Sequence, residues 1–528
     1  MTGQTVTTHA ATAPGVAAIV DEHPDRLALV DAGRPGLTYA ELLDRADRLA
    51  HALDAWGAPR GGVVTAVLPN RREYHEIRLA TGRTGRYFTP VSHHLRPPEI
   101  AYLLSDSGTT LCVTDCSTRD LVEEALLLPG APGGVRVIEL GHEYEDALAG
   151  QPEGPPDQLT AGDFMGYTSG TTGRPKGVRK PLSGGPPVPS QGASQFMARL
   201  GMVPGPGVHL VVGPLYHAAP GTISYFALEL GQTVVIAERP KAEEILALVE
   251  EHRVTHLFTV PTVMGRWLRL PARSREQHDL SSLRSIIHSG APCPPDVKRA
   301  VIDWLGPVVH EFYGATEGSV TTVTSEQWLE RPGTVGLPVP GTDVAVRRVD
   351  GKAAEPGEIG QIWYRPLSPV EYLGDTVKTA ENVRDGWITT GDLGHVDRDG
   401  WLYVADRRTD LILTGGVNVY PAEVEAALLG HPDVADAAVI GAADEDWGQR
   451  VVALLRLEEN ADREGVVARV DAHLRDVIAG PKRPRELHVV DDLPRTAAGK
   501  LRRTEVRAQY DAQFTAGPAT SARPEENR

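Results

Sequence analysis

Apolar and polar residues alternate along the chain in a way that is typical of helices packed on parallel strands. Leucines at positions 42, 43, 49 and 53 recur with helical spacing, which predicts a helix over 40–56 with Thr38 as its N-terminal cap. The apolar run 63–68 ends at Pro69, as expected of a buried parallel strand. Because strand and helix patterns keep alternating beyond this point, we expect an α/β architecture with parallel sheets.

The same patterns predict further elements along the chain. Strands are expected over 111–114, 135–140, 208–213, 234–237 and 257–262, with an amphipathic helix over 242–252. The pair Asp399-Gly400 predicts a hairpin between short strands. The region beyond residue 410 is typical of a small α+β domain, with strands over 437–440, 451–455 and 487–490 and helices from Pro421 to Gly430 and over 463–477.

The length of the chain sets a lower limit on the number of domains. A chain of 528 residues is too long for one ordinary core, so we expect at least two domains. We predict a disordered N-terminus over 1–15, a large domain over 16–408, a small domain over 409–512 and a polar tail over 513–528. We expect no carrier-protein domain after residue 512.

Composition and charge exclude several classes of partner. The hydrophobic fraction of 41% and the charged fraction of 23% are those of an ordinary soluble globular protein. A net charge of −17 argues against a nucleic-acid or anionic-membrane partner. No stretch of about 20 apolar residues could span a membrane, and no signal peptide is recognisable. We therefore expect a cytoplasmic protein.

The three cysteines, Cys112, Cys116 and Cys293, are too few for a disulfide framework and suit a reducing cytosol. Cys112 and Cys116 lie four residues apart in an apolar stretch, with no second pair to complete a zinc site. We expect both to be packed in the interior.

One stretch, 167–178, concentrates the residue types that bind phosphate. It contains three glycines, four aliphatic hydroxyl side chains and one lysine. Glycine lets backbone N–H groups approach a ligand closely, and hydroxyl and ammonium groups add donors for phosphate oxygens. It is not a Walker A loop, because Pro175 precedes Lys176 and Gly177 follows it. Composition alone is equally compatible with a flexible surface loop.

Two later motifs each follow an apolar run. The stretch 285–292 reads as a strand followed by a tight turn, and 309–318 repeats this pattern. The aromatic face of Tyr313 can bury a purine ring, and the Glu317 carboxylate is a natural Mg²⁺ ligand beside a triphosphate. A histidine, His217, follows the strand over 208–213 at the end where open α/β sheets bind ligands. Alone, this histidine is more typical of a capping or core position.

Three motifs near the C-terminus complete the set. Asp392 on a glycine turn can accept both ribose hydroxyls, although an Asx turn explains it equally well. The adjacent glycines Gly415 and Gly416 allow a thin chain to pass close to the backbone. Lys500 lies in the loop 494–501, where a solvated surface lysine is the ordinary alternative.

In this order the motifs resemble those of the adenylate-forming superfamily, which comprises acyl- and aryl-CoA synthetases, stand-alone adenylation domains and luciferases. The resemblance extends over about residues 30–510 and includes six separate motifs. It implies a large N-terminal domain of layered α/β sheets with a β-barrel-like part, and a small mobile α+β C-terminal domain.

The resemblance also implies roles for individual residues. Catalytic roles fall to Lys500, Glu317, Thr316 and His217, with Glu317 on Mg²⁺ and His217 at the mouth of the acyl pocket. The implied nucleotide-binding residues are Thr168, Ser169, Gly170, Thr171, Thr172, Gly173, Lys176, Gly290, Ala291, Pro292, Glu311, Phe312, Tyr313, Gly314, Asp392 and Arg407. Thr409 occupies the hinge position, which is most often Asp or Lys in relatives, and Gly415 and Gly416 line the CoA tunnel.

The implied reaction has two steps. A carboxylate attacks the α-phosphate of ATP to give an acyl-AMP and pyrophosphate, with Mg²⁺ at Glu317 and Lys500 bridging the reacting groups. The small domain then pivots at Thr409, and CoA takes the acyl group as a thioester. The expected ligands are therefore ATP, Mg²⁺, CoA and a small carboxylic acid, and the expected oligomeric state is a monomer or homodimer.

The residues leave the acyl acceptor and the acid open. A separate carrier protein, or nitrite activation followed by diazotisation of an aromatic amine, would use the same nucleotide motifs, and a luciferase-like oxygenase is a rarer alternative. A non-catalytic nucleotide-binding relic is disfavoured because Lys500, Glu317, Asp392 and Arg407 are all present. Fatty, aryl and arylacrylic acids all stay possible because the pocket stretches around 217–225, 260–264 and 289–291 carry no strong pattern.

Overall fold

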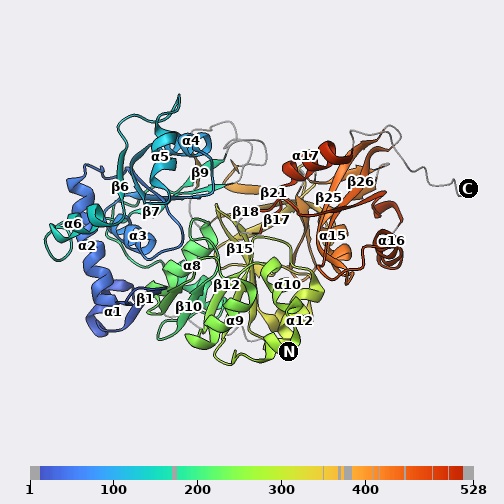
Figure 1. Cartoon of the computed structure of the whole chain (residues 1–528), viewed down its shortest axis with the longest axis horizontal. Helices are drawn as coiled ribbons and strands as arrows, with labels where there is room; N and C mark the ends of the chain where they lie inside the picture. Colours follow the sequence, from blue (N-terminus) through green and yellow to red (C-terminus); the bar gives the residue numbers. More distant parts are fainter. Residues whose placement is uncertain are drawn as a thin grey trace, which may run out of the picture. The chain divides into compact units, whose positions relative to one another are not determined.

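The computed structural model contains two compact units (Figure 1). It describes residues 12–168, 175–348, 350–366, 370–373, 383–407, 410–414, 417–444, 447–478, 480–496 and 499–514. The first unit comprises Met1–Ala345, Trp363–Thr390 and Asp399–Leu402, and the second comprises Val346–Ile362, Gly391–Arg398 and Tyr403–Arg528. The predicted division into a large N-terminal and a smaller C-terminal α/β part is confirmed. The boundaries at 408 and 512 stay predictions.

The first unit is built on a nine-stranded sheet of order β16-β15-β14-β13-β12-β10-β11-β1-β2. The strands from β14 to β1 in this order run parallel, whereas β2, β15 and β16 pair in antiparallel fashion. The bounds are β1 Leu27–Asp31, β2 Leu37–Thr38, β10 Val208–Val211, β11 Thr233–Ile236, β12 His256–Thr259, β13 Ser285–His288, β14 Val309–Ala315, β15 Gly318–Val323 and β16 Leu337–Pro338. Its helices are α7 Gln191–Arg199, α8 Ala218–Glu229, α9 Ala242–Glu251, α10 Pro261–Arg269, α11 Ala272–Glu276, α12 Pro295–Leu305 and α13 Ser325–Glu330.

A second, fully parallel sheet in the same unit has the order β6-β5-β3-β4-β7. Its strands are β3 Val63–Val67, β4 Tyr87–Val91, β5 Thr109–Thr114, β6 Arg136–Glu139 and β7 Asp163–Phe164. The helices are α1 Val16–Glu22, α2 Tyr39–Ala55, α3 Glu73–Arg83, α4 Pro97–Ser107, α5 Arg119–Leu126 and α6 His142–Ala149. Apolar side chains of α2 and α3 share one buried cluster with strands of both sheets, which joins the two sheets into one layered core.

Two smaller sheets carry the remaining strands of the chain up to Arg407. Strands β8 Gly166–Thr168, β9 Lys176–Arg179 and β19 Glu371–Tyr372 form an antiparallel sheet. Strands β17 Asp343–Arg347, β18 Gly360–Arg365, β21 Trp387–Val396 and β20 Val383–Arg384 form another, with β22 Leu402–Arg407 paired to β21. The predicted turn at Asp399-Gly400 connects β21 with β22, which confirms the hairpin.

The C-terminal part of the second unit, from Ile412 on, is an α+β fold with strand order β24-β23-β26-β25, and β27 pairs with β26. The strands are β23 Ile412–Thr414, β24 Val417–Val419, β25 Val434–Asp444, β26 Gly448–Leu457 and β27 Glu486–Val490, and the helices are α15 Pro421–Leu429, α16 Val466–Val477, the short 3-10 turn Gly480–Lys482 and α17 Arg503–Phe514. Alternate residues of β25 and β26 face opposite sides, so one face packs on α15 and α16 and the other on α17.

Most predicted elements are confirmed, and two expectations are wrong. Thr38 caps α2, and its side chain and that of Glu41 form a reciprocal capping box. The strand expected over 257–262 ends at Thr259, because Pro261 starts helix α10 at its first turn. Cys112 is buried as expected, but Cys116 is exposed because it lies in the turn between β5 and α5.

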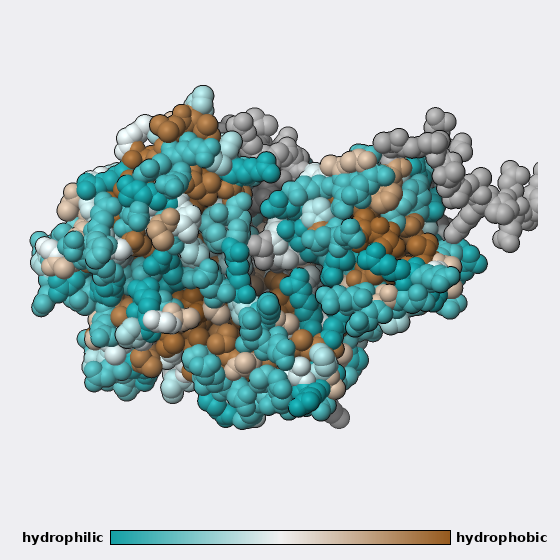
Figure 2. All heavy atoms as spheres, viewed as in Figure 1, coloured by the Kyte–Doolittle hydropathy of each residue, from teal (hydrophilic) through white to brown (hydrophobic). Residues whose placement is uncertain are grey.

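The visible face of the molecule is mainly hydrophilic (Figure 2). The well-exposed large apolar side chains include Leu127, Val188 and Trp447, and these three lie on separate elements and loops. Among the described helices, none is both long and apolar enough to cross a lipid bilayer.

Candidate functional site

The candidate phosphate loop connects the two strands of a β-hairpin. Thr168 at the end of β8 pairs with Lys176 at the start of β9, so these two predicted phosphate ligands face each other across the ends of the loop. Part of the predicted set lies outside the described residues, namely Ser169, Gly170, Thr171, Thr172 and Gly173, together with the side chain of Thr168.

Helix α4 holds both ends of this loop. The Tyr167 hydroxyl donates to Oδ2 of Asp106 at 2.7 Å, and the Tyr102 hydroxyl donates to the carbonyl oxygen of Pro175 at 2.9 Å. Burial and the hydrogen bond to the Asp106 carboxylate raise the pKa of the Tyr167 phenol, which therefore stays protonated as a donor. The Asp106 acceptor and the Tyr102 donor both belong to α4, so the two ends of the loop are kept in a fixed relative position.

A second hairpin, between β14 and β15, presents Thr316 and Glu317 at its reversal. Ala315 pairs with Gly318, and the strands approach so closely at Gly314 that a Cβ atom there would lie 2.6 Å from the Gly318 carbonyl oxygen. Only glycine permits this approach. The Glu317 side chain is buried, with the residue 7% exposed.

The structure brings this reversal to the start of the phosphate-loop hairpin. A Cβ atom on Gly166 of β8 would lie 2.9 Å from Cγ2 of Thr316, so the threonine methyl packs directly on this glycine. The two motifs are 150 residues apart in the sequence (316 − 166) and meet only in the fold. Thr316 and the Thr168–Lys176 hairpin therefore form one candidate subsite.

The residues expected beside adenine come from two neighbouring strands. β13 and β14 run parallel, and His288 at the carboxyl end of β13 pairs with Glu311 of β14. The turn Gly290, Ala291 and Pro292 follows β13, and Gly290 has a φ of +85°, which favours glycine. Phe312 packs edge-on against Phe196 at 5.5 Å between ring centroids.

Glu311 lies at the centre of a buried ion pair. Nζ of Lys298 donates to Oε2 of Glu311 at 2.6 Å, and the lysine side chain is fully buried. Nε2 of His288 is 3.5 Å from the same oxygen, and the Lys298 ammonium lies 5.1 Å from the centre of the Trp328 ring. Burial and the nearby Lys298 charge hold the pKa of His288 well below its usual value, so this imidazole is neutral.

His217 precedes helix α8 and belongs to a cluster of rings. Its ring centroid is 4.6 Å from that of Tyr216, which in turn is 5.7 Å from that of His93. Arg239 donates from one guanidinium nitrogen to Nε2 of His93 at 2.8 Å and of His94 at 2.6 Å. Burial and the Arg239 charge lower the pKa of His93.

The name ring cluster is used here for His93, His94, Tyr216 and His217 together with Arg239, which donates to both His93 and His94. The sequence analysis predicts a ligand site for only one of these residues, His217. The signal that could have pointed to His93 and His94 is the place of this pair, which begins two residues after β4, beyond the carboxyl end of a parallel strand.

The remaining predicted residues belong to the second unit. Asp392 is buried on β21, and Arg407 ends β22, which pairs with β21. The hinge candidate Thr409 lies outside the described residues, as does the side chain of Arg407. Thr414 pairs with Val417 across β23 and β24, and the two glycines between them, Gly415 and Gly416, lie outside the described residues.

The loop that carries Lys500 is a narrow turn. Arg495 and Leu501 form an antiparallel bridge, and the Thr496 N–H donates to the Lys500 carbonyl oxygen at 2.8 Å. The Lys500 N–H donates to Oγ1 of Thr496 at 3.1 Å, and Gly499 has a φ of +78°. The backbone of Lys500 is thus tied to the opposite arm of the turn.

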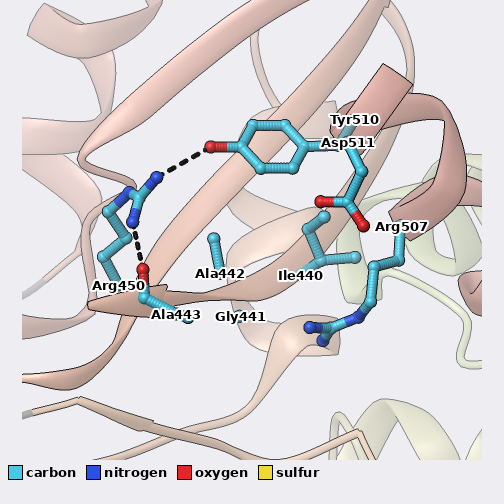
Figure 3. Close-up of a pocket in the computed structure, with 8 residues that line it drawn as sticks. All are labelled: Ile440, Gly441, Ala442, Ala443, Arg450, Arg507, Tyr510 and Asp511. Atoms are coloured by element: carbon cyan, nitrogen blue, oxygen red, sulfur yellow. Dashed lines mark hydrogen bonds between the residues drawn. The ribbon is translucent and has the colours of Figure 1, made fainter. Parts of the chain in front are cut away.

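A cavity of about 280 Å³ lies elsewhere in the second unit (Figure 3). It is lined by residues 440–443 of β25, by Arg450, and by Arg507, Tyr510 and Asp511 of α17. The Arg450 guanidinium donates to the Tyr510 hydroxyl at 3.0 Å and to the carbonyl of Ala443. None of the predicted site residues lines this cavity.

The donor set fits Mg²⁺ held jointly with a nucleotide. Within the described part of the chain, no group of three or more His, Cys, Asp and Glu side chains could hold a metal by itself. Mg²⁺ usually takes one or two carboxylates together with substrate phosphates and water. A single buried carboxylate, Glu317, follows Thr316, whose methyl packs on Gly166 of the phosphate-loop hairpin, and this arrangement fits that pattern.

Comparison with known proteins identifies the family. A family model described as "AMP-binding enzyme" matches residues 16–368, and one described as "AMP-binding enzyme C-terminal domain" matches residues 423–500. A feruloyl-CoA synthase of Amycolatopsis sp is 35% identical over 491 residues, which cover 90% of this chain and 95% of that protein. The fatty acid–[acyl-carrier-protein] ligase ScoC of Streptomyces coeruleorubidus is 32% identical, over 90% of this chain and 92% of its own length.

A solved structure shows the same fold over nearly the whole chain. The o-succinylbenzoate CoA synthetase MenE of Bacillus subtilis, in complex with its acyl-adenylate intermediate, aligns with a TM-score of 0.80 at 29% identity and covers 93% of this chain and 97% of that one. These relatives do not favour nitrite activation, an oxygenase or a non-catalytic relic. The chain belongs to the AMP-binding enzyme family and is an AMP-forming acid–thiol ligase of the acyl- and aryl-CoA synthetase type, which uses ATP, Mg²⁺ and CoA.

Proposed function

We propose that this ligase activates an aryl or arylacrylic acid and transfers it to CoA. The observation that carries the choice of acid is the ring cluster around His217, where imidazole and phenol rings lie within 4.6 and 5.7 Å of one another. Such rings stack on a planar aromatic acid and offer hydrogen bonds to its ring substituents, whereas an alkyl chain gains only from apolar lining. The similarity to a feruloyl-CoA synthase supports the same choice.

The residues assigned from the motifs account for the first half-reaction. The acid carboxylate attacks the α-phosphorus of ATP, the bond to the β-phosphate oxygen breaks, and pyrophosphate leaves. Both reacting groups are negative, so donors placed where charge builds lower the barrier, each by roughly 3–4 kcal/mol. Lys176 and the loop hydroxyls would hold the phosphates, and Lys500 would contact the reacting oxygens.

Further residues would hold the nucleoside and the metal. Tyr313 would stack on adenine, and Asp392 and Arg407 would hold the ribose hydroxyls. Phe312 packs on the Phe196 ring, so its contact with the nucleotide would be made by its backbone. Mg²⁺ at Glu317 would supply positive charge to the phosphate oxygens.

The second half-reaction would use a different face of the small domain. After pivoting at Thr409, the domain would replace the Lys500 loop with the turn at Gly415 and Gly416. CoA sulfur then attacks the acyl carbon, and AMP leaves with the bonding electrons. The chain offers two adjacent glycines at this turn, which suits the close passage of a pantetheine arm.

Domain limits, location and assembly belong to the same proposal. The hinge near 408 would separate a large domain over 16–408 from a small one over 409–512, in keeping with the C-terminal family match over 423–500. All three cysteines are free, which suits the reducing cytoplasm. A monomer or homodimer is expected, and light scattering would distinguish them.

The acid and the acceptor can be tested together. The purified protein is incubated with ATP, MgCl₂, CoA and one of three acids, namely ferulate, palmitate or 2-succinylbenzoate. We expect AMP, pyrophosphate and mainly feruloyl-CoA, measured by chromatography and mass spectrometry. ADP as the sole nucleotide product would overturn adenylation, and palmitoyl-CoA as the main thioester would overturn the aryl assignment.

A separate acyl carrier protein is a second candidate acceptor, because the relative ScoC is a ligase for such a carrier. Replacing CoA with a phosphopantetheinylated acyl carrier protein in the same assay decides between them. Faster transfer to the carrier than to CoA would favour this second candidate.

A further inference from the structure

The loop that carries Lys500 is braced by a guanidinium from within the loop. Arg495 donates from Nε and from one terminal nitrogen to the two carboxylate oxygens of Asp436, at 2.7 and 2.6 Å. Its other terminal nitrogen donates to the carbonyl oxygen of Gly499 at 2.6 Å. One planar group therefore joins the β25 strand to the residue directly before Lys500.

The carboxylate end of this brace is itself fixed. Asp436 lies within β25, and its Oδ1 accepts a hydrogen bond from the Ala437 N–H at 2.9 Å. The side chains of Arg495 and Asp436 are only 19% and 14% exposed, so the charge-assisted pair is shielded from most solvent. Side chains of β25 belong to both hydrophobic clusters of the second unit, so the strand is packed on both of its faces.

We propose that Arg495 is a positioning residue for Lys500, with Asp436 as its anchor, and that this brace serves the adenylation half-reaction alone. The inference rests on the proposed role of Lys500. The Lys500 backbone is already tied to Thr496, and the Gly499 carbonyl is held separately by the Arg495 side chain. The Gly499 carbonyl and the Lys500 N–H belong to one planar peptide unit, so a hydrogen bond that fixes this carbonyl also fixes the direction in which Lys500 leaves the turn.

The geometry requires arginine rather than any cation. A lysine ammonium is a point charge, and it cannot grip both carboxylate oxygens in a plane and also reach a carbonyl on the opposite edge. Arg495→Lys keeps the positive charge but removes the planar guanidinium, a fork of N–H donors that binds both Asp436 oxygens and the Gly499 carbonyl. A displacement of about 1 Å at a catalytic group can lower a rate by about 10²-fold, so we expect a fall of about 10- to 100-fold in adenylation.

The test separates the two half-reactions. Ferulate-dependent exchange of labelled pyrophosphate into ATP measures adenylation, and feruloyl-CoA formation from preformed feruloyl-AMP measures transfer. Arg495→Lys and Asp436→Asn should each lower the exchange rate about 10- to 100-fold and leave transfer within about twofold of the parent. A group that only stabilises the fold would lower both rates together.

A matched control lies directly after this loop. Arg502 lies two residues after Lys500, is exposed, and pairs only locally with Glu505 in the described structure, at 2.7 Å. Arg502→Lys is the same chemical change without loss of a fork, so both rates should stay within about twofold. Thermal unfolding of every variant, followed by circular dichroism, reports whether the fold itself has changed.

A double-mutant cycle tests whether Arg495 and Asp436 act as one unit. If they do, Arg495→Lys combined with Asp436→Asn should lower exchange no more than either change alone. Additive losses, or equal losses in both half-reactions, would overturn the inference.

Failure of the proposed function gives a different result. It would appear as absence of acid-dependent exchange in the parent protein with ferulate, palmitate and 2-succinylbenzoate alike, or as full exchange in Lys500→Ala. Parent activity and an inactive Lys500→Ala, together with unchanged Arg495→Lys, would refute the brace alone.

Discussion

Replacing Lys298 with methionine should destabilise the large unit strongly, because it leaves the Glu311 carboxylate buried without its partner. The lysine side chain is fully buried and that of Glu311 is 9% exposed, with 2.6 Å between Nζ and Oε2. Removing one partner of such a pair lowers the free energy of unfolding by roughly 3–5 kcal/mol. Methionine has a similar length and shape, so little of this loss comes from an empty space.

The neighbouring histidine makes this loss depend on pH. His288 is neutral in the parent protein because burial and the Lys298 charge lower its pKa. Removing the lysine removes one of these causes, and the Glu311 oxygen is already 3.5 Å from Nε2. An imidazolium would then replace the lost ammonium, so the pKa of His288 should rise in Lys298→Met. The deficit in stability should therefore be smaller at pH 6 than at pH 8.

Urea denaturation followed by tryptophan fluorescence measures this effect, and Trp328 is a local probe because the Lys298 ammonium lies 5.1 Å from its ring centre. Arg299→Met is the matched control, since Arg299 is exposed and also lies over Trp328, at 5.6 Å. It should change the free energy of unfolding by less than about 0.5 kcal/mol. Combining Lys298→Met with Glu311→Met should recover most of the loss.

The reasoning would be refuted by a deficit below about 1 kcal/mol in Lys298→Met, since that value is typical of an exposed pair. An equal deficit in Arg299→Met would point to general packing around Trp328 instead of the ion pair. A deficit that grows as the pH falls would refute the role given to His288.

Three further predictions concern the reaction and acid stability. Lys500→Ala should lower adenylation by about 10²-fold or more yet leave the ATP dissociation constant within a few-fold, as measured by single-turnover and binding assays; equal loss in transfer from preformed acyl-AMP would contradict it. Gly416→Leu should let acyl-AMP accumulate while thioester formation stops, and unchanged thioester output would contradict the CoA tunnel. Burial lowers the pKa of His75 and His209 to about 3 and of His256 to about 4. Below the unfolded-state pKa of about 6.5, the unfolded chain takes up protons at these histidines and the folded protein does not. Each histidine should therefore lower the free energy of unfolding by roughly 2 kcal/mol at pH 5 compared with a pH well above 6.5, which is measured as a fall in the urea midpoint.

Elements that depend on residues close in sequence could be predicted. The cap at Thr38, the helix from Pro421 to Gly430 and the turn at Asp399-Gly400 each follow from the chemistry of a few neighbouring residues, and all three are found. The strand over 257–262 was predicted too long, because its apolar run continues past the proline that starts α10. Apolar runs show burial, and they do not by themselves distinguish a strand from the first turn of a buried helix.

Contacts between distant residues could not be predicted in this way. Arg239 reaches His93 across 146 positions, and nothing in either local sequence indicates the other. The burial of Lys298 was equally hidden, because lysine is almost never fully buried unless paired, and its partner Glu311 could be recognised only after β13 and β14 were placed side by side. A single motif can be recognised because its own residues lie close together in the sequence. The contacts between one motif and another, or between a motif and its supporting residues, cannot be recognised in this way.

Two of the candidate loops share one structural solution, which explains this difference. The described ends of the phosphate loop are held by the Tyr102 and Tyr167 hydroxyls through helix α4, and the Lys500 loop is held by Arg495 through strand β25. Loops held in this way keep their catalytic groups within a narrow range without a hydrophobic core of their own. Changes at these ties should therefore alter rates through geometry while the chemistry of the motif residues is left intact.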